Sequence, residues 1–444
     1  MIKLKNSKIF VLGMARSGYE VSKYLSKYDN EIIVTDAKEQ ESSRVQKLES
    51  LGIKVVITDK PEELLNNTYN VVIKNPGIKY TNPLIVKANS LSIPVINEVE
   101  AASYFFPENL QVIGVTGSNG KTTTTNLINE MLKAAGKKVI MAGNMGIPVC
   151  SILNDLDSDT ILLLEISIQQ LCNMNHFKTN VSVLTNLTPT HIDFLDTYEN
   201  YKNTKKRIFN NHTDKDIAIL NLNNNDEIEL TKDIKSHKVY FSSSCNTDIC
   251  INDDYITYFG EKIIKLEDIK LQGMHNYENA CCAIGAVKHY NVDNAAIIKV
   301  LKEFGGVEHR LEYVRTLNNV EYYNDSKATN TVSTTIALKA FNKPTILIMG
   351  GLDRGHSFEP LNDYMKNVKL VVCYGQTKNR IEKWADSLNI AVKVVDNLHD
   401  ATMYANSKAL PGDVILLSPA CASWDQYKCF EDRGTEYKTI VNGL

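Results

Sequence analysis

Residues 114–126 read GVTGSNGKTTTTN and follow the apolar run NLQVI at 109–113. Gly117 and Gly120 allow the backbone to curl so that successive N–H groups point inward, and a helix that begins near Lys121 adds its positive end. The Lys121 ammonium is expected on the β and γ phosphates, and the Thr122 hydroxyl on magnesium. The stretch therefore predicts a triphosphate-binding loop between a strand and a helix.

This loop departs from the strict phosphate-loop pattern at one position. The pattern has glycine five residues before Gly120, where this chain has Val115. The order of strand, Gly-Lys-Thr and helix still favours a phosphate loop. Its contacts to the nucleotide are expected from Gly117, Ser118, Asn119, Gly120, Lys121, Thr122 and Thr123. Such loops occur in GTPases, transport motors and ligases, so other residues must decide the chemistry.

The composition is that of a globular protein with small-molecule partners. The 444 residues are 43% hydrophobic and 23% charged, which suits about three domains. A net charge of -3 without any Lys/Arg block argues against nucleic acid and against an anionic membrane surface as partners. No secretory leader or apolar run of transmembrane length is found, so we expect a cytoplasmic protein without membrane insertion. The nine cysteines form no CxxC pair, which favours buried free thiols over a zinc site.

Short β-branched runs alternate with longer amphipathic segments along the whole chain, which predicts parallel sheets with crossover helices. The fold class is α/β with three domains: an N-terminal Rossmann-like sheet, a central P-loop ATPase-type sheet and a C-terminal Rossmann-like sheet. YFFPENLQ (104–111) and FGGVEHR (304–310) carry Pro or paired Gly between periodic segments. They place the expected domains at 1–106, 107–308 and 309–444.

A second glycine loop, VLGMARSG at 11–18, follows the first predicted strand. With Asp36 at the end of the next strand it is close to a dinucleotide fingerprint. Its middle glycine, however, is Ala15, whose methyl group lies where a pyrophosphate loop usually needs bare backbone. A nicotinamide dehydrogenase and a loop that holds a differently placed diphosphate both remain open at this point.

Two residues at the ends of later strands are candidate metal ligands. Glu165 ends the apolar run ILLLE (161–165), the usual place for a magnesium-linked carboxylate in an open α/β sheet, although a buried structural glutamate is the alternative. His191 follows the next strand in NLTPTHID (186–193), where a packing or surface role is as common as a metal role.

Ten separated segments resemble the motifs of the Mur ligase family, and the N-terminal block extends the resemblance to nearly the whole chain. They are GVTGSNGKTTTT, AGNMGIP, LLLEIS, NLTPTHID, NYKNTKKRIF, GMHNYENA, HRLE, NDSKATN, GGLDRG and SPACASWDQYKCFEDRG. The resemblance implies ATP-dependent amide bond formation through an acyl phosphate, with release of ADP and phosphate, in peptidoglycan precursor synthesis. NDSKATN and SPACASWDQ point to UDP-N-acetylmuramoyl-L-alanine and D-glutamate as substrates. A monomer is expected.

The resemblance also implies roles for the central residues. Lys121 would act on the γ-phosphoryl group, while Thr122 and Glu165 would share one Mg²⁺ ion and His191 would bind a second. Lys205 matches the family lysine that carries a carbamate and becomes a metal ligand, although its place in a polar helical segment alone would make it a surface lysine. Asn276 and Asn279, three apart, would recognise adenine and ribose, for which a helix cap is the alternative.

The remaining roles concern the two substrates and the third domain. Arg310 and Asp325 would reach the nucleotide. D-Glutamate contacts are implied for Lys327, Thr329, Arg354, Ser423 and Phe430, with Arg354 suited to grip a carboxylate. Contacts to the UDP-linked substrate are implied for Met14, Ala15, Arg16, Asp36, Asn75, Asn144, Ser167 and Gln170. The first glycine loop would then face a UDP diphosphate.

The chain departs from the family at three places. Ile168 and Gln169 replace the usual Ser-Phe pair, Cys281 and Cys282 replace alanines, and Glu308 stands where an apolar residue or proline is more usual. Rival interpretations are another amide ligase, such as the L-alanine-adding enzyme or a folate polyglutamate synthase, and a nucleotide-binding regulator without chemistry. Retention of Lys121, Glu165, His191 and Lys205 argues against the regulator.

Overall fold

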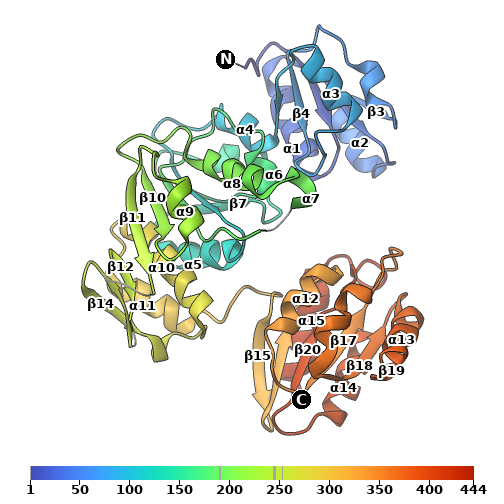
Figure 1. Ribbon diagram of the computed structural model, residues 1–444. Helices are drawn as coiled ribbons and strands as arrows, with labels where there is room; N and C mark the ends of the chain where they lie inside the picture. The colour runs from blue at the N-terminus through green and yellow to red at the C-terminus, as the bar shows by residue number, and fades with distance from the viewer. Residues whose placement is uncertain (1, 190–191, 244–246, 253) are drawn as a thin grey trace. The chain divides into compact units, whose positions relative to one another are not determined.

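A computed structural model describes residues 2–189, 192–243, 247–252 and 254–444. The chain divides into two compact units, Met1–Phe304 and Gly305–Leu444. The first unit holds two sheets and the second holds one, and helices flank all three (Figure 1). This confirms the predicted α/β class with three sheets. The predicted boundary at 106/107 falls within the first unit and stays a prediction.

The first sheet has the order β3-β2-β1-β4-β5, and all its strands are parallel. Its strands are β1 (Lys8–Leu12), β2 (Glu31–Asp36), β3 (Lys54–Ile57), β4 (Val71–Lys74) and β5 (Val95–Ile96). Its helices are α1 (Arg16–Leu25), α2 (Ser42–Glu49), α3 (Pro83–Ser90) and α4 (Glu98–Ser103). The strand order reverses between β1 and β4, and ligands of open α/β sheets bind at such a switch point, beyond the carboxyl ends of the strands.

The central sheet has the order β14-β13-β12-β11-β10-β9-β6-β8-β7. Its strands are β6 (Gln111–Thr116), β7 (Val139–Gly143), β8 (Ile161–Glu165), β9 (Val181–Leu184), β10 (Ile217–Asn221), β11 (His237–Ser242), β12 (Ile249–Ile251), β13 (Tyr255–Tyr258) and β14 (Glu261–Lys265). The seven strands from β7 to β12 are parallel, and β13 and β14 add an antiparallel edge. All five residues of β8 are buried, as expected for a parallel strand covered on both faces.

Helices on both sides of the central sheet carry the candidate site. They are α5 (Lys121–Ala134), α6 (Ile168–Leu171), α7 (Ile192–Leu195), α8 (Tyr198–Lys206), α9 (Asn225–Leu230), α10 (Met274–Lys288) and α11 (Asn294–Glu303). Helix α5 contacts α10 and α11, while α8 contacts α6. Cys281 and Cys282 on α10 are fully buried, in keeping with the expectation of preserved packing. The eight described cysteines are all free thiols.

The third sheet has the order β15-β16-β20-β17-β18-β19, parallel except for the β15–β16 pair. Its strands are β15 (Glu312–Leu317), β16 (Val320–Asn324), β17 (Thr345–Gly350), β18 (Val368–Tyr374), β19 (Ala391–Val394) and β20 (Val414–Leu417). Helices α12 (Thr331–Lys339), α13 (Lys378–Ser387), α14 (Leu398–Lys408) and α15 (Phe430–Asn442) complete this unit. The carboxyl ends of β16, β20 and β17 lie side by side and lead into the predicted acceptor-binding loops.

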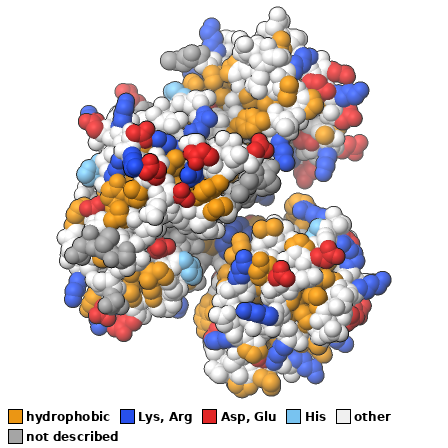
Figure 2. Space-filling view, in the orientation of Figure 1, with side chains coloured by type: hydrophobic (Ala, Val, Ile, Leu, Met, Phe, Trp, Pro, Cys, Tyr) orange, Lys and Arg blue, Asp and Glu red, His pale blue; other side chains and the backbone are white. Residues whose placement is uncertain are grey.

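One hydrophobic core joins the first two sheets, since Val11 of β1, Ala101 of α4 and Leu164 of β8 belong to the same buried cluster. In the second unit, two clusters cover opposite faces of the third sheet. On the visible face, Lys/Arg and Asp/Glu side chains are interspersed (Figure 2). Within the described ranges, no helix is long and apolar enough to cross a lipid bilayer.

The beginning of the second unit is tied to its last helix, which accounts for the unusual Glu308. The Lys438 ammonium of α15 pairs with the Glu308 carboxylate and lies 3.0 Å from Glu312 Oε1. The His309 ring is buried against Gly434, where an added Cβ would lie 2.1 Å from His309 Nδ1. These contacts fasten residues 308–312 to α15.

Candidate functional site

The predicted phosphate loop lies between β6 and α5, as the sequence indicates. Gly117 and Gly120 have φ values of 144° and 80°, which other residues rarely adopt. A Cβ at Gly117 would lie 2.0 Å from Thr185 Oγ1, and one at Gly120 would lie 2.2 Å from Asn279 Oδ1. Both positions therefore require glycine for conformation and for space.

Residues that follow β9 hold this loop in place. The backbone N–H groups of Ser118 and Asn119 donate to the backbone O and Oδ1 of Asn186, each at 2.9 Å. The Thr185 hydroxyl donates to the Asn119 carbonyl at 2.5 Å. Two loop amides are engaged in this way, whereas the amides in the first turn of α5 have no intrahelical partner and can donate to phosphate. Thr122 and Thr123 lie in that turn and are half-buried.

Lys121 folds back over the loop from the first position of α5. Its ammonium donates to the carbonyls of Gly117 and Ser118, both at 2.9 Å. Carbonyl groups of a phosphate loop are weak partners compared with phosphate oxygens, because a charged acceptor roughly doubles the strength of a hydrogen bond. The lysine is therefore held where a polyphosphate would meet it.

Glu165, at the carboxyl end of β8, leaves one oxygen unused. Its Oε1 accepts a hydrogen bond from Asn144 Nδ2 at 2.8 Å, and its Oε2 is buried with no hydrogen-bond partner. A buried carboxylate oxygen without a partner is costly unless an ion or proton satisfies it. The position of this oxygen, close to the phosphate loop, fits a ligand to Mg²⁺.

Lys205 of α8 is buried, contrary to the surface position that its polar helix alone suggests. Only 1% of the residue is exposed, and its Nζ donates to Thr116 Oγ1 at 2.8 Å, on the last residue of β6. Burial lowers the pKa of this amine well below its usual range, and the nearby charge of Lys121 lowers it further. A neutral amine is the form that reacts with carbon dioxide, so the environment favours the predicted carbamate. His191, the other expected metal ligand, lies outside the described residues.

The two predicted adenine-binding residues lie on α10, beside the phosphate loop. Asn279 is buried against Gly120, and its Oδ1 accepts from Thr124 Oγ1 at 3.3 Å. Asn276 is half-buried one turn earlier, and its Nδ2 donates to the Gln272 carbonyl at 3.0 Å. Neither side chain caps the helix, whose first flanking residue is Gly273.

The first glycine loop is anchored by Asp36, and Gly13 at its start has a positive φ of 93°. Met14 N–H donates to Asp36 Oδ2 at 2.8 Å, and Lys38 N–H donates to Asp36 Oδ1 at 3.0 Å. Ala15 is exposed with an extended backbone at the start of α1. Asn75, after β4, adjoins this loop, since a Cβ at Gly13 would lie 3.1 Å from Asn75 Cβ.

Arg16 links the first loop to the central sheet. Its Nη1 donates to the Gly146 carbonyl at 3.3 Å, two residues after the exposed Asn144. The residues predicted to contact the UDP-linked substrate thus belong to two sheets of the same unit. One of them, Asn144, donates a hydrogen bond to Glu165.

Two further residues predicted to bind this substrate have a local structural role. Ser167 and Gln170 form a reciprocal cap on α6, with Ser167 N–H donating to Gln170 Oε1 at 2.8 Å and Gln170 N–H donating to Ser167 Oγ at 3.3 Å. The S-x-x-Q spacing is the sequence signature of such a cap. Ile168, one of the departures from the family, is buried, and Gln169 is half-buried.

In the second unit, predicted residues gather beyond the carboxyl ends of β16 and β20. Asp325 accepts from Ser418 Oγ at 2.8 Å and from Leu311 N–H at 3.1 Å. Burial raises the pKa of Asp325 to about 7, partly offset by these hydrogen bonds and by Arg310. Arg310 itself is exposed.

Lys327 and Phe430 lie together in this unit. The Lys327 ammonium is 5.7 Å from the centroid of the Phe430 ring, which also meets the His309 ring edge-on at 6.1 Å. Lys327 N–H donates to the His309 carbonyl at 2.9 Å. Thr329, half-buried, follows in the same loop.

Arg354 lies on an exposed loop after β17, with its guanidinium 4.7 Å from the centroid of the Trp424 ring. Among the described residues, its acidic neighbour Asp353 pairs with Arg380 instead. The Arg354 guanidinium thus packs against an aromatic ring rather than against this carboxylate. Ser423, next to Trp424, is 2% exposed, and its hydroxyl has no hydrogen-bond partner.

The prediction from sequence missed two residues that organise these loops. Trp424 stacks on Arg354, and only its place inside the SPACASWDQ segment could have drawn attention to it. Arg433 is completely buried and donates to the carbonyls of Ser326 at 2.8 Å and Cys421 at 3.1 Å, which joins the two loops that carry Lys327 and Ser423. A buried arginine gives no signal in hydrophobic periodicity.

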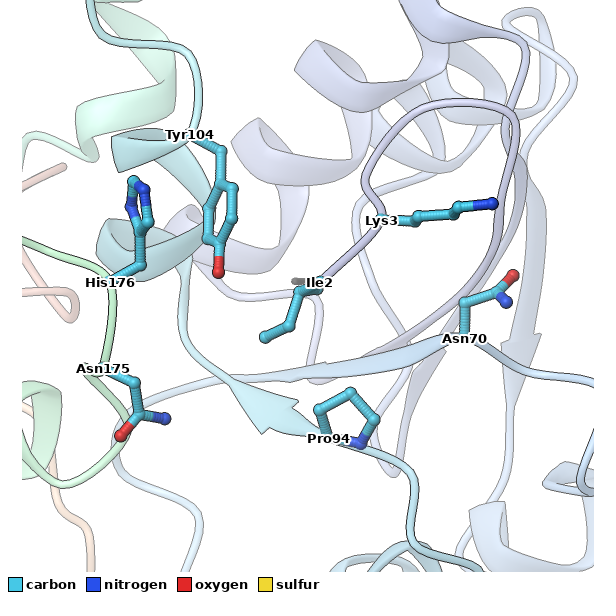
Figure 3. A pocket seen from close by; sticks show the side chains of 7 residues that line it. All are labelled: Ile2, Lys3, Asn70, Pro94, Tyr104, Asn175 and His176. Atoms are coloured by element: carbon cyan, nitrogen blue, oxygen red, sulfur yellow. The ribbon is translucent and has the colours of Figure 1, made fainter.

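One pocket of about 840 Å³ lies elsewhere in the first unit (Figure 3). Asn70 and Pro94, which line it, precede β4 and β5, so the pocket lies at the amino ends of these strands. The rings of Tyr104 and His176 stack there with centroids 4.2 Å apart. This is the edge of the sheet opposite to the glycine loops, and the pocket contains none of the predicted residues.

Three family models match successive parts of the chain. Residues 7–97 match the Mur ligase MurD-like N-terminal domain, residues 115–287 the Mur ligase middle domain, and residues 309–421 the Mur ligase glutamate ligase domain. Among solved structures, UDP-N-acetylmuramate-alanine ligase from Thermotoga maritima has a TM-score of 0.58 at 18% identity and covers 98% of this chain and 99% of its own. A MurF structure from Acinetobacter baumannii has a TM-score of 0.58 at 14% identity, with 98% and 93% covered. These two similarities concern the fold.

Curated relatives match at higher identity. UDP-N-acetylmuramoylalanine--D-glutamate ligases from Bacillus cereus (strain AH187) and Bacillus anthracis (strain A0248) are each 42% identical over 446 residues, covering 100% of this chain and 99% of the relative. Similarity of this extent over the full length, together with the three domain matches, shows that the chain belongs to the Mur ligase family.

Proposed function

We propose that this protein joins D-glutamate to UDP-N-acetylmuramoyl-L-alanine, with ATP as the energy source. The family forms peptide bonds in peptidoglycan precursor synthesis at the expense of ATP. The choice of D-glutamate rests on the names of relatives that are 42% identical over the whole chain. Acceptor-side residues Arg354 and Lys327 carry the two cations that an amino acid with two carboxylates needs.

The observation that carries the proposal is the arrangement around the end of β6 and β8. A phosphate loop with its lysine, a buried carboxylate oxygen without a partner and a buried, readily neutral amine share one sheet edge. Within the described residues, no group of three His, Cys, Asp or Glu side chains is suited to a metal ion. A metal site here would therefore depend on Glu165, Thr122 and a carbamate on Lys205, with His191 as the family's further ligand.

The proposed division of labour follows from these positions. Lys121 and the first turn of α5 hold the β and γ phosphates and stabilise the charge that develops on the transferred phosphoryl group. Glu165 and Thr122 would hold magnesium, which would offset the negative charge of the phosphates. The muramoyl carboxylate accepts the phosphoryl group, and the D-glutamate amine then attacks the acyl phosphate and expels phosphate. Arg354 and Lys327 orient the acceptor, so that the reaction gains from proximity.

Phosphate release with ATP and Mg²⁺ tests the proposal when one substrate at a time is omitted. We expect release only when both UDP-N-acetylmuramoyl-L-alanine and D-glutamate are present. L-Alanine, L-glutamate and a folate acceptor serve as controls. Release with a different pair would reassign the substrates within the family, and no release with any pair would favour a regulator without chemistry.

The carbamate has its own test. We expect the ligase rate to fall in carbon dioxide-depleted buffer and to recover on addition of bicarbonate. A ¹³C-labelled carbonyl signal that is absent in Lys205→Arg would identify the modified residue. An undiminished rate after depletion, without such a signal, would remove the carbamate from the proposal.

A further inference from the structure

Lys74, the last residue of β4, is a buried lysine to which the proposed reaction assigns no role. Only 1% of the residue is exposed. Its Nζ donates to the carbonyls of Ile78 at 2.9 Å, Pro76 at 3.1 Å and Asn75 at 3.4 Å. All three N–H groups of the ammonium thus donate to one loop, residues 75–78.

This loop lies at the point where the strand order of the first sheet reverses. Asn75 N–H donates to the Leu12 carbonyl at 2.9 Å, at the end of β1. Asn75 and Ile78 also contact the Gly13 position of the first glycine loop, as the 3.1 and 3.4 Å approaches to an added Cβ there demonstrate. Lys74 therefore supports the two loops between which a ligand of such a sheet binds.

The charge of Lys74 has no carboxylate to balance it. The Cys172 thiol acts on its amine and the Tyr80 ring lies 5.3 Å from it, and burial lowers the pKa of Lys74 to about 8. A buried cation that meets only carbonyl dipoles and an aromatic ring is costly in an otherwise apolar interior. A bound anion near the ammonium would offset this cost.

We propose that Lys74 is a positioning residue for the UDP-linked substrate: it shapes loop 75–78 and supplies the positive charge beneath its diphosphate. A diphosphate carries two or more negative charges, and among the loop residues Met14, Ala15, Arg16 and Asn75 only Arg16 carries a positive charge. The inference rests on the proposed function and adds to it the residue that recognises the phosphate charge. Lys74 would act in substrate binding rather than in phosphoryl transfer. Its substitution should therefore change the affinity for the UDP-linked substrate.

The test compares ligands that differ in charge. We would measure the binding of UDP, uridine and inorganic pyrophosphate to the full chain by calorimetry, for wild type, Lys74→Met and Lys74→Arg. Lys74→Met is expected to weaken the binding of UDP at least about tenfold. The affinity for uridine should change less than about twofold, since only the phosphates interact with the charge of Lys74. Lys74→Arg should retain most of the UDP affinity. Pyrophosphate that binds as tightly as UDP would mean that free anions, not the nucleotide, occupy the site.

Steady-state kinetics give a second measurement. Lys74→Met should raise the KM for UDP-N-acetylmuramoyl-L-alanine and leave the KM values for ATP and D-glutamate within about twofold. Lys87→Met is the matched control, because Lys87 of α3 also donates to a backbone carbonyl, that of Glu62 at 2.8 Å, but not to loop 75–78. The control should leave all three KM values unchanged.

The wild-type protein provides a measurement that does not depend on how a variant folds. Since the Lys74 ammonium loses its proton above about pH 8, UDP affinity should fall between pH 7 and 9. Tyr80, whose ring lies 5.3 Å from the amine, and Cys172 face Lys74, and burial raises the pKa of both, so they stay neutral in this range. Affinity that is flat with pH, or equal losses of UDP and uridine in Lys74→Met, would overturn the inference. Absence of UDP binding and of turnover in the wild type would instead contradict the proposed function.

Discussion

The two glycine loops of the first unit begin alike, each after a buried strand and before a helix, yet they are held in different ways. In the loop at 13–18, only Gly13 has a positive φ, and Gly18 serves packing, because an added Cβ would lie 1.8 Å from the Gly13 carbonyl oxygen. Asp36 fixes the loop through Met14 N–H. In the loop at 117–120, two glycines with positive φ curl the chain, and Lys121 reaches back across it.

The two loops therefore suit two different ways of binding phosphate. The second loop gathers the start of a helix, a lysine and the proposed ligands of a metal ion around one point, which suits charge that changes during a reaction. The first loop presents a fixed surface, with Lys74 buried beneath the neighbouring loop 75–78, which suits a phosphate that is bound but not transferred. Substitutions in the two loops should therefore differ in which substrate they affect.

Lys121→Ala should have the largest effect. Removal of the ammonium that meets the γ-phosphoryl group is expected to lower phosphate release by about 10³-fold or more. UDP binding, which depends on the first loop, should stay at the wild-type level. Phosphate-release assays and calorimetry check the two halves of this expectation, and a thermal melt confirms the fold. Normal turnover would mean that the ATP site is not at this loop.

A glycine-to-alanine substitution in each loop tests this comparison directly. Gly117→Ala forces a Cβ to within 2.0 Å of Thr185 Oγ1, whereas the nearest atom at Gly13→Ala is at 3.1 Å. We expect Gly117→Ala to abolish ATP turnover and to destabilise the fold by roughly 3 kcal/mol, and Gly13→Ala to cost about 1 kcal/mol and to raise only the KM for the UDP-linked substrate. Gly52→Ala is the control, since it has φ 77° and no atom within 4 Å of the added Cβ. Equal behaviour of the two variants would break the comparison.

Arg354→Ala tests a residue that belongs to neither loop. Loss of a carboxylate clamp should raise the KM for D-glutamate by about 10- to 100-fold, because a charge-assisted pair is lost. The KM values for ATP and the UDP-linked substrate should hardly change. Arg380→Ala of α13 serves as the control, since Arg380 pairs with Asp353 next to Arg354 and has no predicted role in binding D-glutamate. A parallel rise in the KM for ATP would show that Arg354 is misassigned.

Asp36→Asn should have the smallest effect. The amide oxygen can keep the bond from Met14 N–H, but the charge and the acceptor for Lys38 N–H are lost, which corresponds to about 1 kcal/mol and about a fivefold rise in the KM for the UDP-linked substrate. Phosphate release at saturating substrate should be normal. A loss of phosphate release would mean that the first loop takes part in the chemistry, contrary to the comparison.

Much of this architecture follows from local patterns in the sequence. Apolar runs such as ILLLE predict buried parallel strands, and the glycines and lysine at 117–121 predict the phosphate loop, because both depend on neighbouring residues. The cap formed by Ser167 and Gln170 could also have been read from its spacing. Family resemblance instead assigned both residues to substrate, a role that stays a prediction.

What could not be predicted depends on contacts between distant residues. The polar segment YENYKNTKK gives no sign that Lys205 is buried, because the burial comes from packing against Thr116, 89 residues earlier. The sequence around Glu308 likewise gives no reason for its charge, because its partner Lys438 lies 130 residues later. Lys74 likewise occupies an ordinary strand end in the sequence, and only the folded loop brings three carbonyls to its amine.

The stacking of Arg354 on Trp424 has a consequence for spectroscopy. The chain has two tryptophans, Trp384 and Trp424, and both lie in the second unit. Trp424 is 63% exposed, so its emission responds to the charge and solvent around the guanidinium above it. With Trp384 replaced by phenylalanine, the intrinsic fluorescence of the whole protein becomes a single-site reporter on the acceptor loop, and the 304 residues of the first unit contribute no tryptophan background.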